Sequence, residues 1–282
     1  MVSSIKRVNG GVYMQSDEMR AWVECSLEFH GREEGFARLL KKHASAQQIL
    51  HSCGIKDRHE TAERILAVCK KLGISIITQA DACFPESFYA SSAPIVFYAK
   101  GDTDILTYKK TAGVIGARKA ADSSLRICSD ITGKLAKKGV VIVSGFAQGI
   151  DRCAHTSCIS CGGKTVAVLG CGIGYDYPKG SLELEEKIAQ SGAVISEYPP
   201  LVPPKREYFR RRNRLIAALS SKLLVVEASD KSGCLNTAGH ALQQGKDIFV
   251  IPPADIRSQR FQGQVGLIRD GAAIAFEAED IY

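Results

Sequence analysis

The sequence predicts an α/β protein in which a small helical unit precedes a doubly wound, mostly parallel sheet. Beyond residue 105, short apolar runs alternate with helix-like segments, and this alternation is typical of parallel strands with helices on both faces. Before residue 73, apolar residues instead recur every three or four positions, as in amphipathic helices. An apolar content of 45% in 282 residues is enough for a sizeable core.

The first 73 residues are expected to form the helical unit. Three segments have helical periodicity, MRAWVECSLEF, FARLLKKHASAQQILHSCG and TAERILAVCKKLG, and Gly54 and Gly73 are stop signals. Strand-like runs begin at Ile74. We therefore expect two domains, residues 1–73 and 74–282.

The strands and helices of the second domain follow in order. Strands are expected at ISIIT, PIVFYAKGD, TAGVIGA, GVVIVSG, KTVAVLG, GAVISEY, KLLVVEA and DIFVIP. Helices are expected at SSLRICSDITGKLAKK, SLELEEKIAQS, RRNRLIAALS and NTAGHALQQG, and also after the glycines of VVIVSGFAQGIDRCAH. In a parallel sheet the carboxyl ends of the strands share one edge, and ligands bind in the crevice there.

The loops at that edge favour a phosphate-bearing ligand. Gly145 and Gly149 can adopt positive φ and let a ligand approach the backbone, and the N–H groups of the following helix would face it. An ordinary tight turn is the alternative for one glycine pair. Small, polar or Gly-rich residues follow nearly every strand, which favours a groove over tight packing alone. These residues are Gly116-Ala117-Arg118, Ser144 to Gly149, Gly170-Cys171-Gly172, Ser196 to Pro199, and Glu227 to Ser229 leading to Ser232-Gly233.

A basic run supplies charge to the same edge. Residues 205–214, KREYFRRRNR, hold six cations interleaved with Tyr208 and Phe209. Arginine forks pair with phosphates, and exposed aromatic rings stack on bases, so the run predicts a nucleic-acid-binding surface. A solvated helix face is the alternative. Arg118 is a second candidate phosphate clamp.

Composition adds weaker constraints. The net charge of +7 would help to attract polyanions. No stretch approaches the roughly 18 apolar residues of a membrane span, and the N-terminus lacks a secretory apolar region, so we expect a cytoplasmic protein with reduced thiols. Cys153, Cys158 and Cys161, with Cys171, have a spacing known from iron–sulfur ligation, but they also suit buried positions on a helix.

Catalytic residues are scarce in the sequence. Asp151 and His155 could form an acid/base pair, but a helix cap and a packed, hydrogen-bonded histidine are the favoured interpretation. Neither HExxH nor GxxxxGK[ST] occurs in the chain. We expect a protein that is not an enzyme.

At these residues the sequence resembles the DprA/Smf family of bacterial DNA-processing proteins. The resemblance runs from about Ile74 to Tyr282 through ordered motifs that include IGAR, VSGFAQGID, GGKTVAVLGCGIGYDYP, ISEYPP, FRRRNRLIAALS and LIRDGA. It implies an extended Rossmann-like domain after a helix-hairpin or SAM-like unit. It further implies single-stranded DNA binding, dimerisation, and loading of the RecA recombinase during natural transformation or recombination. It implies no cofactor and no established catalysis.

Position by position, the resemblance puts the DNA-contacting pocket on a defined set of residues. The expected DNA or phosphate contacts, including those from the strand ends, are Gly116, Ala117, Arg118, Ser144, Gly145, Phe146, Gln148, Gly149, Lys179, Phe209, Arg210, Arg211, Arg212, Asn213, Arg214, Ser232 and Gly233. Gln148 stands where the family usually has Arg, Pro253 replaces a glycine, and Val265-Gly266 replace an expected Asn. The family's winged-helix domain is expected to be absent.

A Rossmann-like enzyme or sensor that cleaves or binds a nucleotide is the alternative function. The phosphoribohydrolases that share this architecture have a PGGxGTxxE signature. The corresponding stretch here is SGCLNTAGH, in which His240 stands at the position of the catalytic Glu. This difference argues against hydrolysis and leaves nucleotide binding open.

Overall fold

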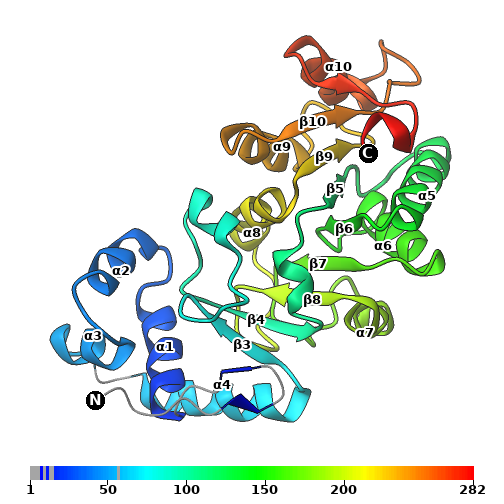
Figure 1. The fold of residues 1–282 in the computed structure, drawn as a ribbon. Coiled ribbons are helices and arrows are strands. Elements are labelled where there is room, and N and C mark those ends of the chain that lie inside the picture. The colour runs from blue at the N-terminus through cyan, green and yellow to red at the C-terminus, as the bar shows by residue number, and fades with distance from the viewer. Residues whose placement is uncertain (1–6, 9–10, 13–15, 56–57) are drawn as a thin grey trace.

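The computed structural model describes residues 7–8, 11–12, 16–55 and 58–282 and is built on one nine-stranded sheet (Figure 1). The strand order is β11-β10-β9-β5-β6-β7-β8-β4-β3. All neighbours from β11 to β8 are parallel, whereas β4 is antiparallel to both β8 and β3. The strands are β3 Ser75–Thr78, β4 Val96–Gly101, β5 Thr111–Ile115, β6 Val141–Ser144, β7 Thr165–Leu169, β8 Ala193–Ser196, β9 Lys222–Val225, β10 Asp247–Val250 and β11 Ala273–Ile274.

Helices cover both faces of this sheet because its central strands are apolar on both sides. Every residue of β5, β6, β7 and β8 is buried. The helices after β3 are α5 Asp122–Lys137, α6 Ile150–Ser160, α7 Leu182–Ser191, α8 Arg206–Leu219, α9 Cys234–Gln243 and α10 Gln262–Arg269. Short 3₁₀ turns are η1 Glu86–Ser91, η2 Asp104–Thr107, η3 Gln259–Phe261 and η4 Ala278–Asp280.

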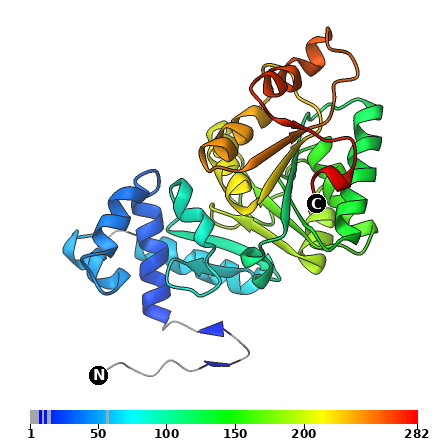
Figure 2. The ribbon, with the colours of Figure 1, turned by 45° about the horizontal axis from the view of Figure 1, so that its top comes forward.

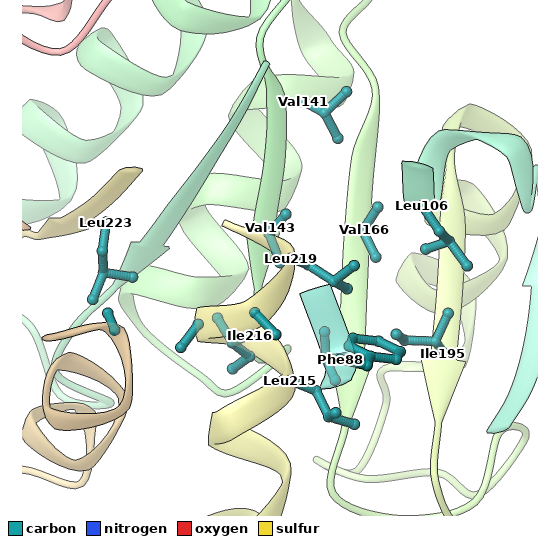
Figure 3. Packing of buried hydrophobic residues seen from close by; sticks show 14 of the residues in the cluster. Phe88, Leu106, Val141, Val143, Val166, Ile195, Leu215, Ile216, Leu219 and Leu223 are labelled. Carbon is teal, nitrogen blue, oxygen red and sulfur yellow. The ribbon is translucent and has the colours of Figure 1, made fainter. Parts of the chain in front are cut away.

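Alternate side chains of the central strands face two different layers. Val143 and Val166 belong to a cluster that also holds Leu215 and Leu219 of α8 (Figure 3). Ile142 instead packs with α5 and α6 in a second cluster. The resulting doubly wound α/β arrangement confirms the predicted fold class, and the antiparallel edge formed by β4 and β3 makes the sheet mixed.

Four helices lie together at the β3 end of the sheet (Figures 1 and 2). They are α1 Ser16–Glu28, α2 Glu33–Leu40, α3 Ala46–Ser52 and α4 His59–Leu72. Gly73 ends α4 in the left-handed conformation with φ 64°. Trp22 and Phe36 of this unit share one hydrophobic cluster with Tyr98 and Leu169 of the sheet. The core is therefore continuous across residue 73, and the division into two domains stays a prediction.

Other described features lie outside the main sheet. Strands β1 Arg7–Val8 and β2 Gly11–Val12 pair with each other in antiparallel fashion. Within the described ranges, no helix combines the length and the apolar composition needed to span a bilayer.

Candidate nucleic-acid interface

A groove of about 1160 Å³ lies at the carboxyl ends of β5, β6 and β9. Its walls come from the loops after these strands and from the beginning of α8 and α9. Every exposed charged side chain among its described lining residues is a cation, namely Arg118, Lys119, Lys205, Arg206, Arg210, Lys231 and Arg260. Its two acidic residues, Asp151 and Glu227, are only 7% and 1% exposed. The accessible wall is thus positive, which suits a polyanion.

A smaller pocket of about 220 Å³ adjoins this groove. Both cavities are lined by Arg118, Ala147, Tyr177 and Phe209. Residues 145–148 of the turn and the exposed residue Lys179 also line the pocket. Charged groups and backbone amides therefore converge at one end of the groove.

The glycine turn between β6 and α6 forms one wall of that pocket. Phe146 adopts φ 62° and Gly149 φ 79°. A Cβ on Gly149 would collide with the carbonyl oxygen of Ala117, and the N–H of Ile150 donates to the same oxygen at 3.2 Å. This close approach holds the loop of Gly116, Ala117 and Arg118 beside the turn. The sequence suggested that Gly145 and Gly149 make room for a ligand, but a Cβ on either glycine would meet protein atoms instead.

Backbone N–H groups of the turn are available to a ligand. Within the described residues, the N–H groups of Phe146, Gln148 and Gly149 have no protein acceptor. Phe146 and Gln148 also line the small pocket. Free amides beside a helix N-terminus favour anions, and here the N–H of Ala147, which donates to Asp151, interrupts the series. Ser144 differs, since its buried hydroxyl donates to Val114 O at 2.6 Å and does not line either cavity.

The basic run on α8 does not form the single exposed surface that the sequence predicts. Lys205, Arg206 and Arg210 are exposed and line the groove. Arg211 is half-buried, and Arg212 and Arg214 are buried. The reason is geometric, because a helix that covers a sheet must bury one side, and α8 contributes five apolar residues to the core.

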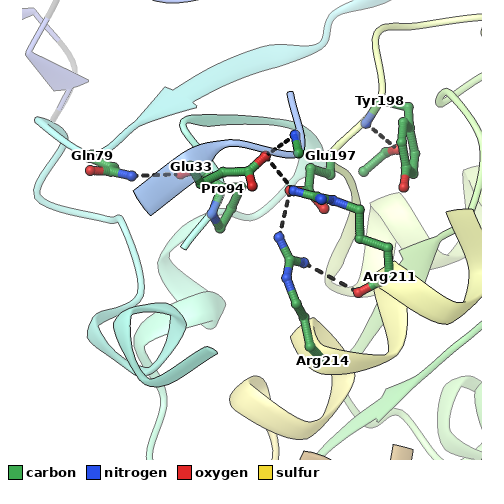
Figure 4. A network of polar contacts seen from close by, with 9 residues as sticks. Glu33, Gln79, Pro94, Glu197, Tyr198, Arg211 and Arg214 are labelled. Atoms are coloured by element: carbon green, nitrogen blue, oxygen red, sulfur yellow. Dashed lines mark hydrogen bonds and ion pairs between the residues drawn. The ribbon is translucent and has the colours of Figure 1, made fainter. Parts of the chain in front are cut away.

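Two of these inward arginines hold an ion-pair network (Figure 4). Nη2 of Arg214 lies 2.6 Å from Oε1 of Glu197, and Nη2 of Arg211 lies 3.3 Å from the same oxygen. Arg211 also pairs with Glu33 of α2. The network connects α8, the end of β8 and the helical unit.

Arg212 lies on the floor of the groove. Its Nη1 donates to the carbonyl oxygen of Gly145 at 2.5 Å and to that of Val168. Only 4% of the residue is exposed, and burial lowers the pKa of its guanidinium to about 10. Asn213 donates to Oδ1 of Asn236 at 3.2 Å and also lines the groove, as do Ser232 and Gly233.

The two aromatic residues of the run have different surroundings. Phe209 lines both cavities, and its ring packs against Gly170, where a Cβ would lie 2.6 Å from the ring. Tyr208 is stacked on Tyr198 with a centroid distance of 3.8 Å and a 16° angle. Only Phe209 therefore presents its ring to the groove.

Three groove cations, Lys119, Lys231 and Arg260, are not among the contacts predicted from the sequence. Arg260 Nη1 donates to Glu227 Oε1 at 2.9 Å and to Lys119 O at 3.0 Å. Lys119 directly follows the IGAR motif and could have been included. Arg260 lies in an irregular segment without a motif, and only the folded chain brings it to this edge.

Asp151 and His155 are not bonded to each other. Asp151 accepts from the N–H of Ala147 at 3.3 Å, and burial raises the pKa of this carboxyl to about 6. His155 Nδ1 lies 2.7 Å from Oγ1 of Thr165, and burial, followed by the charge of Arg212, lowers the pKa of its ring to about 3. Both residues are buried beneath the turn in hydrogen-bonded positions, as expected for His155. Asp151 is not the expected helix cap, because the N-cap of α6 is Gly149 and Asp151 binds the turn before the helix.

The cysteines after the turn have separate partners. Cys153 donates to Leu125 O and Cys158 to Lys164 O, both at 3.3 Å. In the part of the chain that the structure describes, no three His, Cys, Asp or Glu side chains are grouped as metal ligands.

Together, the doubly wound sheet and the cation-lined groove at its strand ends define a Rossmann-like α/β protein with a positively charged edge. Comparison with known families identifies the family within this class. The family model described as DNA recombination-mediator protein A matches residues 75–282, and the chain belongs to this family. The family is described by its role in recombination, in agreement with the expectation that the chain is not an enzyme.

Relatives and solved structures agree with this assignment. DNA processing protein DprA of Bacillus subtilis (strain 168) is 35% identical over 222 residues, which cover 78% of this chain and 74% of that protein. The X-ray structure of DprA from Streptococcus pneumoniae has a TM-score of 0.73 at 28% identity, covering 94% of this chain and 92% of that one. A structure of DprA from Helicobacter pylori, described for its single-stranded DNA binding mode, has a TM-score of 0.66 at 30% identity. The match covers 74% of this chain and 93% of that one.

Proposed function

We propose that this protein binds single-stranded DNA in the groove at the strand ends and, as a homodimer in the cytoplasm, loads a RecA-type recombinase during DNA uptake and recombination. The observation that carries the DNA-binding part is the composition of the groove, whose exposed charged residues are all cations. The Helicobacter pylori relative, described for its single-stranded DNA binding mode, supports the same ligand. Recombinase loading and dimerisation rest on the family resemblance.

Phosphate contacts are assigned to the accessible groups of the groove. Arg118 and Lys179 flank the small pocket, and Arg206 and Arg210 extend the positive wall along α8. The free amides of Phe146 and Gln148, both of which line the small pocket, complete the site at the turn. Gln148 offers no charge, so this position contributes its backbone N–H and a neutral side chain. Gly116 and Ala117 let the strand approach the loop after β5.

The preference for unpaired bases is assigned to Phe209. Its ring lies where the small pocket opens into the groove. Stacking of a base on an aromatic ring contributes about 1–3 kcal/mol and requires that the base leave its pair. Duplex DNA cannot offer a base in this way, so single strands should bind more tightly.

The nucleotide-sensor alternative has less support. The small pocket, at about 220 Å³, lies below the roughly 300–1,000 Å³ typical of small-molecule sites. His240, at the position of the hydrolase Glu, lines neither of the two cavities. An open, extended groove fits a strand better than a single nucleotide.

The test is fluorescence anisotropy of a labelled single-stranded oligonucleotide at several salt concentrations, with unlabelled duplex as competitor. Wild type should bind with salt-sensitive affinity and resist duplex competition. Arg64→Ala is a matched control, since Arg64 is an exposed arginine that pairs with Glu60 on α4, 2.5 Å away. Absence of binding at low salt would overturn the proposal, and binding of a mononucleotide instead would favour the sensor.

A further inference from the structure

The side chain of Arg212 is buried although the sequence counts it among the groove cations. It lies at the groove floor, yet 4% exposure leaves little of it for a ligand. Its Nη1 is already used by two carbonyl oxygens, those of Gly145 and Val168. Arg118, Arg206 and Arg210, in contrast, are exposed and line the groove.

The bond to Gly145 fixes the direction of one peptide group. In a trans peptide the C=O and the following N–H point to opposite sides. Because the Gly145 carbonyl points down to Arg212, the N–H of Phe146 points away from it. That N–H has no protein acceptor within the described chain. Residues 145–148 also line the small pocket.

Asp151 also holds this turn. Its Oδ2 accepts the N–H of Ala147 at 3.3 Å. A Cβ at Gly145 would lie 2.7 Å from this Oδ2 and 2.8 Å from Nη2 of Arg212. The two opposite charges therefore converge under the α-carbon of Gly145, where only glycine fits. The charge of Arg212 lowers the pKa of the Asp151 carboxyl and so opposes part of the rise that burial causes.

The backbone of Phe146 is in a strained conformation, which the contacts of Arg212 and Asp151 with its neighbours support. Phe146 is a non-glycine residue at φ 62°, which persists only where surrounding contacts determine it. Its ring is buried and lies 6.1 Å from the ring of His155. Arg212 fixes the carbonyl before Phe146, and Asp151 fixes the amide after it.

We propose that Arg212 is a positioning residue that does not contact DNA, and that with Asp151 it holds the Gly145–Gly149 turn so that its free amides face the phosphate. This inference rests on the proposed single-stranded DNA binding. It assigns the direct phosphate contacts to the turn and to exposed cations such as Arg118. Arg212 then contributes through backbone geometry instead of charge.

The salt dependence of binding separates the two roles. A residue that neutralises a phosphate contributes about −0.7 to the log–log slope of affinity against salt for single strands. Arg212→Lys keeps the charge but cannot donate in the same fork. We expect it to lose about tenfold in affinity with an unchanged slope, whereas Arg118→Ala should flatten the slope. Wild-type affinity in Arg212→Lys, or a flattened slope in Arg212→Gln, would overturn the assignment.

A second measurement needs no DNA. Hydrogen–deuterium exchange of the full-length protein should be faster in peptides covering residues 144–150 for both Arg212→Lys and Asp151→Asn, with α5 peptides unchanged as the folding control. An unchanged turn would refute the positioning role even if binding fell. If wild type fails to bind single strands while the turn still loosens in these variants, the proposed function fails and the structural role of Arg212 stands.

Discussion

The guanidinium carbon of Arg118 lies 5.5 Å from the centroid of the Phe209 ring. This contact joins the loop after β5 to the first turns of α8, and it places an exposed cation and an aromatic ring at the mouth of one pocket. A strand entering the groove would meet both groups together. A base that stacks on Phe209 must therefore share the ring with Arg118 or displace it.

Arg118 and Phe209 should consequently be coupled in DNA binding. Arg118→Ala should weaken single-strand affinity and reduce the salt slope by about 0.7. Phe209→Leu should cost about 1–3 kcal/mol without changing the slope. In the double variant we expect a smaller loss than the sum of the two, measured by anisotropy. Strict additivity would contradict a shared site.

Gly149→Ala should destabilise the protein more than the same substitution at another glycine with positive φ. Gly149 has φ 79° and abuts the Ala117 carbonyl. Gly139 has φ 71°, but a Cβ there meets nothing within 4 Å, so Gly139→Ala carries the backbone penalty alone, about 1 kcal/mol. The melting temperature of Gly149→Ala should be well below that of Gly139→Ala. Only Gly149→Ala should weaken DNA binding. Equal melting temperatures would count against the close approach.

His155 should make stability depend on pH. Its pKa is about 3 in the folded protein, against about 6.5 in an unfolded chain. The unfolded state then binds more protons below pH 6.5, so the contribution of the neutral ring is full above that pH and is lost on acidification. The stability advantage of wild type over His155→Asn should shrink by about 1.4 kcal/mol per pH unit below 6.5.

Wild type must be compared with His155→Asn, because Asp151 changes the pH dependence of stability in the opposite direction. Its raised pKa of about 6 lowers stability as the pH rises from about 4 to 6, but it does so equally in both proteins. Denaturant titrations at pH 7, 6 and 5 would measure the difference. A difference that stays constant with pH would show that the histidine is not held neutral.

Arg214→Met should lower the free energy of unfolding. The variant removes one partner from the buried Glu197, which is left with Arg211 alone. We expect a loss of about 2–3 kcal/mol, less than the 3–5 kcal/mol of a pair broken completely. Arg64→Met, which breaks the exposed pair with Glu60, should change stability by less than about 1 kcal/mol in the same urea titration. Equal effects would mean that burial of Glu197 contributes nothing.

The central strands were predictable because their signal is local. The apolar run of β7 is bounded by glycines, and all of its residues are buried. The short α10 and the two-residue β11 were missed, since LIRDGA and its surroundings have weak periodicity. For such elements the neighbouring strand β10 decides the structure, and the sequence window does not contain it.

The site was predictable to a similar extent. The glycines identified the turn, because a Cβ at Gly145 or Gly149 would collide with neighbouring protein atoms. The direction of each arginine on α8 was not predictable, because it depends on Gly145 and Glu197, which lie far away in the sequence. Arg260 joined the groove for the same reason, through its contact with Glu227.

The hydrophobic cluster that contains both Trp22 and Leu169 has a consequence for cooperativity. Removing the helical unit from the sheet would expose apolar surface of this shared cluster on both parts, so the cluster couples their stabilities, and the sheet holds two further clusters of its own. Heat should unfold both in a single transition. A ligand in the groove would then raise the melting temperature of helices that it never touches, and a probe on Trp22 would report its binding.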